Sequence, residues 1–209
     1  MNNTATIKRP DEQGAISIQG HIKIFDPLSK EVFIDKRNAI HYENFSLAMA
    51  RSLSSQGFGT IAEMAFGNGG TRVGETGIIT YLTPNTVGTS SALYNETYIK
   101  IIDPKLPDSL DPARNFMEVR HVLGTAYSDI LVSCLLDFGE PAGQAAFDNA
   151  TNTDGEFVFD ELGLKSYSPE GPGMGDLLTH VIFHPVQKSL NRMIQIDYTV
   201  RVQSLTNGI

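Results

Sequence analysis

The chain contains no tryptophan, one cysteine and no long run of apolar residues. With Cys134 as the only cysteine, no disulfide can form within the chain. No stretch approaches the roughly 18 apolar residues that a membrane-spanning helix requires, so no membrane partner is expected. The N-terminal stretch MNNTATIKRPDEQG also lacks the apolar core of a signal peptide, and we expect the protein in cytosol-like conditions.

Basic residues are fewer than acidic residues and are scattered singly along the chain. There are 16 Lys and Arg against 24 Asp and Glu, which gives a formal net charge of -8. Affinity for nucleic acids depends on clustered basic residues that neutralise phosphates. The charge distribution therefore predicts no specific nucleic-acid binding.

Length and composition favour one globular domain. The 209 residues are 41% hydrophobic, and the 19 glycines and 10 prolines are close to average usage. A chain of this size can bury one sizeable core. We expect a β-rich structural domain over residues 15–205, with an N-terminal arm over residues 1–14 and a C-terminal tail over residues 206–209.

Alternating apolar and polar residues predict strands along most of the chain. In residues 15–25, AISIQGHIKIF, isoleucine alternates with other residues, and residues 15–35 predict a hairpin in which Gly20 marks a bulge or a close crossing. Residues 192–205 alternate almost without interruption and predict a long last strand. Cys134 lies in a similar alternation and is expected to be a buried apolar residue. Further strands are expected near residues 60–66, 77–82, 92–102, 115–123, 128–138, 155–162 and 177–186.

The spacing changes at about residues 43–54, where apolar side chains recur every three or four residues. This pattern predicts one short amphipathic helix. We expect Asn44 or Asn38 to cap its N-terminus, and Gly57 and Gly59 to end it.

These elements together predict a mainly β fold. About ten strands and one helix, joined by loops of varied length, favour an antiparallel β-sandwich or a jelly-roll-like single domain. Long excursions are expected at residues 103–114, 139–155 and 165–176. Loops of this length tend to be functional or to be ordered by partners.

The sequence GNGG at residues 67–70 follows an apolar stretch and raises the question of a phosphate-binding loop. The Lys-Ser/Thr pair of a P-loop is missing, and Thr71 and Arg72 are a poor substitute. No predicted helix follows whose N-terminus could hold a phosphate. We expect a strand-to-strand loop whose residues tolerate positive φ, and no nucleotide cofactor.

Two patterns come close to metal-binding motifs, but neither predicts a metal site. His180 and His184 lie in an extended segment, so the two rings would be about 13 Å apart along a strand. Residues 150–161, ATNTDGEFVFDE, match several positions of a calcium-binding loop, but Ala150 occupies the first ligand position. Hydrogen-bonded structural histidines are expected instead.

The sequence also lacks a convincing catalytic motif. It contains no Gly-x-Ser-x-Gly sequence, the nucleophile motif of α/β-hydrolases. Nothing shows that acidic residues near the strand ends converge as a carboxylate pair. These acidic residues are Asp137, Glu140, Asp160 and Glu161. We expect a protein that is not an enzyme, without catalytic, cofactor-binding or metal-binding residues; a small hydrolase with His180 or His184 as its base is an alternative.

Five stretches are spread over the chain between residues 22 and 203: IKIFDPLSKEVFIDKRNAIHYENFSLAMARSL, IAEMAFGNGGT, LYNETYIK, FVFDELGL and LLTHVIFHPVQKSLNRMIQIDYTVRVQ. Together they resemble a set of small virion structural proteins of tailed bacteriophages, of the neck, collar and baseplate type. The resemblance implies a non-enzymatic protein that assembles into a ring or sleeve at the neck or collar, without a cofactor.

The resemblance also implies the partners and the location. The partners would be copies of the same chain in a symmetric ring and other phage head-tail or tail proteins, in a virion assembled in the host bacterial cytoplasm. A last strand suited to pairing across subunits and long excursions that could wrap neighbours are compatible with this role. A baseplate or tail-tube-associated protein and a capsid decoration protein are alternatives.

A carbohydrate-binding β-sandwich module is an alternative of a different class, because jelly-roll-like folds often bind sugars. The absence of tryptophan and the scattering of the seven tyrosines argue against it. Sugar-binding platforms usually need exposed aromatic faces.

Overall fold

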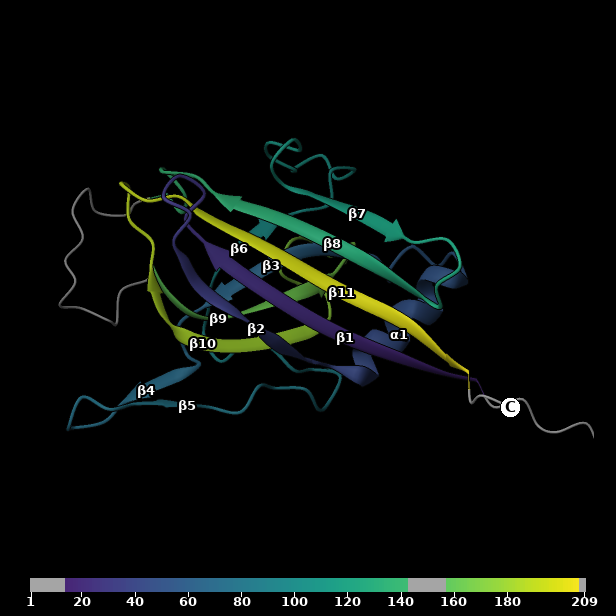
Figure 1. Ribbon diagram of the computed structural model, residues 1–209, viewed down its shortest axis with the longest axis horizontal. Coiled ribbons are helices and arrows are strands. Elements are labelled where there is room, and N and C mark those ends of the chain that lie inside the picture. Colours follow the sequence, from purple (N-terminus) through teal and green to yellow (C-terminus); the bar gives the residue numbers. More distant parts are fainter. Residues whose placement is uncertain (1–13, 143–156, 207–209) are drawn as a thin grey trace, which may run out of the picture.

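The computed structural model describes residues 14–142 and 157–206. Within these residues the chain forms eleven strands and one helix (Figure 1). The helix is α1 (Tyr42–Leu53), and the strands are β1 (Gly14–Phe25), β2 (Val32–Ile40), β3 (Ile61–Gly67), β4 (Thr71–Val73), β5 (Ile79–Tyr81), β6 (Glu96–Ile101), β7 (Phe116–His121), β8 (Tyr127–Leu136), β9 (Val158–Ser166), β10 (Thr179–Gln187) and β11 (Ile194–Thr206). Among the residues described, no helix is both long enough and apolar enough to cross a membrane.

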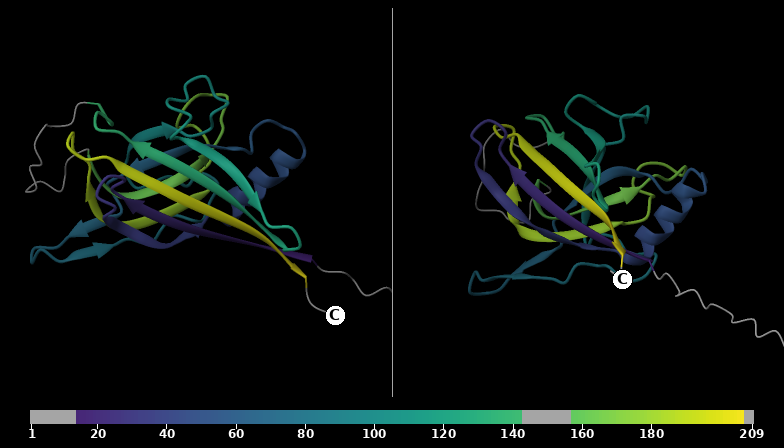
Figure 2. Two further views of the ribbon diagram at one scale, coloured as in Figure 1. Left: turned by 45° about the horizontal axis from the view of Figure 1, so that its top comes forward. Right: turned by 45° about the vertical axis from the view of Figure 1, so that its right-hand side comes forward.

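Nine strands form one antiparallel sheet in the order β6-β3-β9-β10-β2-β1-β11-β8-β7, and β4 and β5 form a separate two-stranded ladder. The large sheet curls so that its two halves face each other around the hydrophobic core (Figure 1, Figure 2). The predicted fold class is confirmed: the protein is mainly β, with one helix and a curled antiparallel sheet that is sandwich-like. The edges of this sheet are β6 and β7.

The long last strand lies inside the sheet and not at an edge. β11 pairs with β1 from Gly14 opposite Thr206 to Phe25 opposite Gln195, and its other side pairs with β8. Both sides of β11 are therefore occupied within the chain. The expectation that this strand pairs across subunits is wrong, because its backbone groups already have partners.

Gly20 on β1 marks a close crossing and not a bulge. It lies opposite Val200 in the ladder with β11 and opposite Asn38 at the first pair of the ladder with β2, and neither ladder shifts register there. A Cβ atom at Gly20 would come within 1.6 Å of the Oδ1 of Asn38. The amide of Asn38 donates to the hydroxyl of Tyr198, so the glycine makes room for a contact between an amide and a phenol.

The helix begins one residue before the predicted range of residues 43–54, and its caps differ from those expected. His41 is the N-cap, and its Nδ1 accepts a hydrogen bond from the N–H of Asn44 over 3.2 Å. Asn44 is the third residue of the helix, and its side chain donates to the carbonyl of Leu177 over 2.9 Å. Asn38 belongs to β2. The helix ends at Leu53, before the glycines that were expected to end it.

Three strands depart clearly from the prediction. β2 continues to Ile40, five residues beyond the end of the predicted hairpin. β4 was not predicted, because three residues are too short to show alternation. β9 extends to Ser166, so residues 165 and 166 belong to a strand and not to the excursion expected at residues 165–176. All residues of β9 are buried, and a strand covered on both faces shows no alternation by which its end could be found.

Several segments named in the sequence analysis lie partly outside the described residues. The expected N-terminal arm, apart from Gly14, and the C-terminal tail, apart from Thr206, lie outside them. The excursion expected at residues 139–155 lies outside them from residue 143 onward.

Candidate functional site

The Gly-rich loop between β3 and β4 binds carboxylates of the protein itself. The N–H groups of Gly70 and Thr71 donate to the two carboxylate oxygens of Asp160, each over 2.9 Å, and the Thr71 hydroxyl donates to the same side chain. The N–H of Gly69 donates to Oε1 of Glu161 over 3.1 Å. Successive N–H groups in a turn form a concave site for anions. The loop does cradle anionic groups, but they come from β9.

The glycines of this loop are needed for close approach. A Cβ atom at Gly70 would lie 2.9 Å from Cγ2 of Ile182, and one at Gly69 would lie 2.7 Å from Cβ of Tyr94. Neither glycine adopts a positive φ. The expectation that the loop uses positive φ was wrong, because the constraint at these positions is lack of space beside β10 and the segment before β6.

Glu161 on β9 is buried and accepts four hydrogen bonds. Its Oε2 accepts from Nε2 of His180 over 2.9 Å and from the N–H of Tyr94 over 3.0 Å. Its Oε1 accepts from the N–H groups of Gly69 and Asn95. Burial by itself raises the pKa of Glu161, but these hydrogen bonds outweigh it and hold the pKa below its ordinary value.

The neighbouring Asp160 has the opposite shift. Burial raises its pKa, and the hydrogen bonds from Thr71 and Gly70 offset this effect only in part. The nearby charge of Glu161 raises the pKa of Asp160 further. One loop therefore holds two carboxylates whose pKa values are pushed apart.

The two ring nitrogens of His180 on β10 have different hydrogen-bond partners. Its Nδ1 accepts a hydrogen bond from the N–H of Asn85 over 2.8 Å, so its proton lies on Nε2, which donates to Glu161. The side chains of His180 and Glu161 have no exposed surface, so a substrate does not reach this ring. His184 is exposed and lies apart from them, with its Nδ1 3.2 Å from the hydroxyl of Tyr81.

The structure thus gives both histidines hydrogen-bonded partners, as predicted. Within residues 14–142 and 157–206, no group of three His, Cys, Asp or Glu residues could hold a metal ion. Most of the calcium-like pattern, residues 150–156, lies outside the described residues, and its last position, Glu161, is used by the Gly-rich loop.

A contact between serine and histidine lies at the start of α1. Nε2 of His41 is 3.0 Å from Oγ of Ser91 and 2.9 Å from the carbonyl oxygen of Gly88. Because Nδ1 accepts from the N–H of Asn44, Nε2 carries the proton and cannot accept one from Ser91. The Ser91 hydroxyl donates to the carbonyl of Val87 over 2.7 Å. The contact caps the helix and holds a loop, and it lacks the arrangement of a nucleophile and its base.

Sequence reasoning missed this contact. Its only sequence signal is a histidine directly before the helix, which indicates a cap and not a catalytic group.

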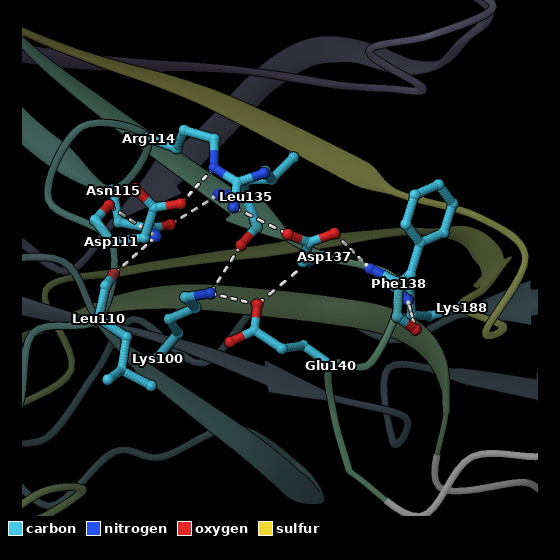
Figure 3. Close-up of polar contacts among 10 residues, drawn as sticks. All are labelled: Lys100, Leu110, Asp111, Arg114, Asn115, Leu135, Asp137, Phe138, Glu140 and Lys188. Atoms are coloured by element: carbon cyan, nitrogen blue, oxygen red, sulfur yellow. Dashed lines mark hydrogen bonds and ion pairs between the residues drawn. The ribbon is translucent and has the colours of Figure 1, made fainter.

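A cluster of polar side chains joins the two edges of the curled sheet (Figure 3). The pairing of β7 with β8 begins opposite Ser133, so the backbone of Leu135 has no β7 partner. The N–H of Leu135 donates to Oδ1 of Asn115 over 2.8 Å, and its carbonyl accepts from Nζ of Lys100 on β6 over 2.7 Å. Side chains therefore complete the hydrogen bonds of β8 where a strand is missing.

The charges in this cluster are paired with each other (Figure 3). The ammonium of Lys100, whose side chain is 6% exposed, contacts the carboxylate of Glu140. The guanidinium of Arg114 contacts Asp137 over 2.8 Å and also contacts Asp111. These ion pairs connect β6, the loop that follows β8 and the loop that precedes β7.

The four acidic residues considered from the sequence form two separate groups. Asp137 and Glu140 lie together, since the N–H of Asp137 donates to Oε2 of Glu140 over 3.1 Å, but each carboxylate binds a different cation. Asp160 and Glu161 bind the Gly-rich loop. Within the described residues, the four carboxylates therefore do not converge on one site, and each binds other groups of the protein.

Lys188 extends the cluster that joins the sheet edges. Its Nζ donates to the carbonyls of Ser189 over 2.9 Å and Phe138 over 3.3 Å. Burial lowers the pKa of Lys188 to about 8. The N–H of Phe138, together with Arg114, holds the pKa of Asp137 below its ordinary value. These contacts are those of a structural polar cluster.

A surface groove lies between α1 and β7. Its volume is about 430 Å³, and Phe45 and Ala48 of α1 form part of its buried floor. Two exposed apolar side chains flank it: Leu53 is 86% exposed and Val119 is 71% exposed. Exposed apolar side chains gathered around a groove mark an interaction site. Its charged lining residues are Asp103, Lys105 and Glu118.

The ladder of β4 and β5 projects from the body of the molecule as an arm, residues 71–81 (Figure 1, Figure 2). Val73 lies opposite Ile79, and the alternation of strands puts both on the same face as Tyr81. Val73 and Tyr81 are each 53% exposed, and Ile78 at the turn is 65% exposed. A two-stranded ladder is marginally stable by itself in water, and this one contacts the body of the protein through β10.

The groove and the arm are therefore the candidate functional surfaces. The polar clusters described above make internal contacts, whereas these two surfaces expose apolar side chains. Comparison with known proteins adds no relative: no family model, no curated protein and no solved structure matches this chain.

Proposed function

We propose that this protein is a non-enzymatic structural subunit of a tailed-bacteriophage virion and that it assembles with copies of itself into a ring or sleeve at the neck or collar. The proposal rests on the contrast between buried polar side chains and exposed apolar surfaces. Side chains able to do chemistry, such as His180, Glu161 and His41, are buried and hydrogen-bonded, whereas the groove and the arm expose apolar side chains. Exposed apolar patches are typical of surfaces that bind other proteins.

The contacts of the histidines support this role over that of a hydrolase. A general base must lie within reach of the substrate proton that it removes. His180 has no exposed surface, and the Nε2 of His41 already carries a proton. His184 is exposed but contacts only the Tyr81 hydroxyl among the polar contacts described for its ring. Neither buried histidine is placed to activate a water or a hydroxyl group.

The resemblance to virion structural proteins supplies the phage setting of the proposal. It rests on five stretches between residues 22 and 203, and these include the Gly-rich loop and most of the first hairpin and of the last strand. The expected partners are copies of this chain and other head-tail or tail proteins. A station at the baseplate, along the tail tube or on the capsid surface would use the same kind of surfaces.

Immunogold electron microscopy of intact virions tests the proposal. An antibody raised against the purified chain should label the neck or collar, and pre-immune antibody should label nothing. Label at the baseplate, the tail tube or the capsid would mean that the chain belongs at the labelled place and not at the neck or collar. Absence of label from every intact particle would contradict the virion role.

A further inference from the structure

We propose that the arm of one copy, residues 71–81, lies in the apolar groove of the next copy, between α1 and β7. This inference rests on the proposed assembly of the chain with copies of itself. It gives the groove one occupant and covers the apolar side chains that the arm leaves exposed, among them Val73 and Ile78.

The root of the arm is fixed to the body. The N–H and hydroxyl of Thr71 donate to Asp160, a buried side chain near the start of β9. On the second strand, the hydroxyl of Tyr81 lies 3.2 Å from Nδ1 of His184 on β10. A fixed root presents the arm in one direction, which reduces the entropy lost when it docks.

The tip of the arm is closed by its own hydrogen bonds. The N–H of Gly74 donates to the carbonyl of Ile78 over 2.9 Å, and the N–H of Gly77 donates to the carbonyl of Gly74 over 2.9 Å. Gly77 has a φ of 78°, in the left-handed region that favours glycine. The turn therefore displays Ile78 outward, and this side chain is 65% exposed.

The groove presents the complementary chemistry. Its lining is mainly apolar, with Phe45 and Ala48 at the floor and the exposed Leu53 and Val119 at the sides. Docking of the apolar arm face would cover both sets of side chains and release the water in contact with them. Such a desolvated apolar centre with a charged rim is the usual composition of a specific interface.

The charges at the two surfaces can pair with opposite signs. The arm carries exposed Arg72 and Glu75. The groove is lined by Asp103 and Glu118, which can pair with Arg72, and by Lys105, which can pair with Glu75. Complementary charges of this kind select the partner and its orientation more than they add affinity.

The occupant is a second copy because the arm points away from its own groove. In each view β4 and β5 project on the side of the molecule away from α1, which forms one wall of the groove (Figure 1, Figure 2). Contact between two different surfaces is heterologous, and it repeats from copy to copy until the rotation closes a ring. An arm-to-arm contact would instead end at a dimer.

Two double variants of the full chain test the contact. Val73→Asp with Ile78→Asp places charges on the arm, and Leu53→Gln with Val119→Glu places polar groups beside the groove. These four side chains are 53% to 86% exposed, so each variant should keep the monomer fold. Leu28→Asp is the control, since Leu28 is 66% exposed in the turn between β1 and β2, outside both surfaces. Circular dichroism and thermal unfolding check the fold of each protein.

Native mass spectrometry over a concentration series measures the oligomeric state of each protein. Wild type and Leu28→Asp should form the same oligomer. Each double variant should self-associate roughly 30-fold more weakly or worse, the loss of one interface hot spot, and should become monomeric. An equimolar mixture of the two double variants should form a heterodimer and nothing larger, because one arm and one groove remain intact in each such pair.

The outcomes separate this inference from the proposed assembly. A double variant that assembles like wild type, or a mixture that stays monomeric, would overturn the contact between arm and groove while wild-type assembly stands. A wild-type chain that is monomeric at every concentration would overturn the assembly itself and this contact with it.

Discussion

Nε2 of His180 donates a hydrogen bond to Oε2 of Glu161 over 2.9 Å, and neither side chain has any exposed surface. The remaining hydrogen bonds of this pair come from backbone N–H groups of loops, including those of Gly69 and Asn85. The pair therefore ties β9 and β10 to the segments on either side of the arm. Its loss should affect both the core and the root of the arm.

Replacing Glu161 by Gln should lower the free energy of unfolding by about 3 kcal/mol. Four donors converge on the carboxylate, and the glutamine amide would turn a donor toward some of them. Urea unfolding at neutral pH measures the change. The control is Glu170→Gln, because Glu170 is exposed and should tolerate the change. Equal stability of Glu161→Gln and the control would contradict the structural role of the pair.

The two neighbouring acids predict opposite pH dependences. The pKa of Glu161 in the folded state lies below its ordinary value of 4.5, so its stabilising effect is present above that pH and is lost as the pH falls through the lower folded-state value. The pKa of Asp160 in the folded state lies above its ordinary value of 3.8, so ionised Asp160 opposes folding and this effect is relieved as the pH falls.

Urea unfolding from neutral pH down to about pH 3 checks both signs. The stability advantage of wild type over Glu161→Gln should shrink as the pH falls. The stability of wild type relative to Asp160→Asn should rise over the same range. A difference that is constant with pH for either variant would show that the corresponding carboxylate does not have the shifted pKa.

Gly70→Ala should destabilise the protein by about 1 to 3 kcal/mol, because the added Cβ would lie 2.9 Å from Cγ2 of Ile182. Gly139→Ala is the matched control, since a Cβ at Gly139 meets nothing within 4 Å and its φ is not positive. The thermal midpoint should fall for the first variant and stay nearly constant for the second. An equal fall of the thermal midpoint in both variants would mean that lack of space beside Ile182 is not the reason for glycine at position 70.

Lys100→Met should destabilise the protein by about 3 kcal/mol, since it leaves the carboxylate of Glu140 and the carbonyl of Leu135 without their partner. A double-mutant cycle with Glu140→Gln should show a coupling of about 1 to 3 kcal/mol. Lys105→Met, at an exposed position, is the control. Additive effects in the cycle would mean that Lys100 and Glu140 do not stabilise each other.

Elements with a clear period could be predicted from the sequence. The alternation over residues 15–25 and 192–205 identified β1 and β11, and the three-to-four spacing identified α1. The pattern could not give the sheet position of β11, because alternation shows which face is buried and not which strands flank it. It also could not give the end of β9, which is buried on both faces.

The polar clusters could not be predicted because their partners are far apart in the sequence. Asp160 and Gly70 are 90 residues apart, and Lys100 and Leu135 are 35 apart. The excursion at residues 103–114, expected to be functional or to be ordered by partners, is joined to the loop after β8 by the ion pair between Arg114 and Asp137. Spacing within one segment carries no information on such contacts. The sequence did predict correctly that Cys134 is buried, and its burial raises the pKa of the thiol to about 12.

The central claim is that this protein acts through surfaces that bind copies of itself. Sedimentation analysis of the purified full chain over a wide range of concentrations tests this claim most directly. We predict one discrete oligomer that forms as the concentration rises, with a mass that is a whole multiple of the monomer mass. A single species of monomer mass at every concentration would contradict the claim.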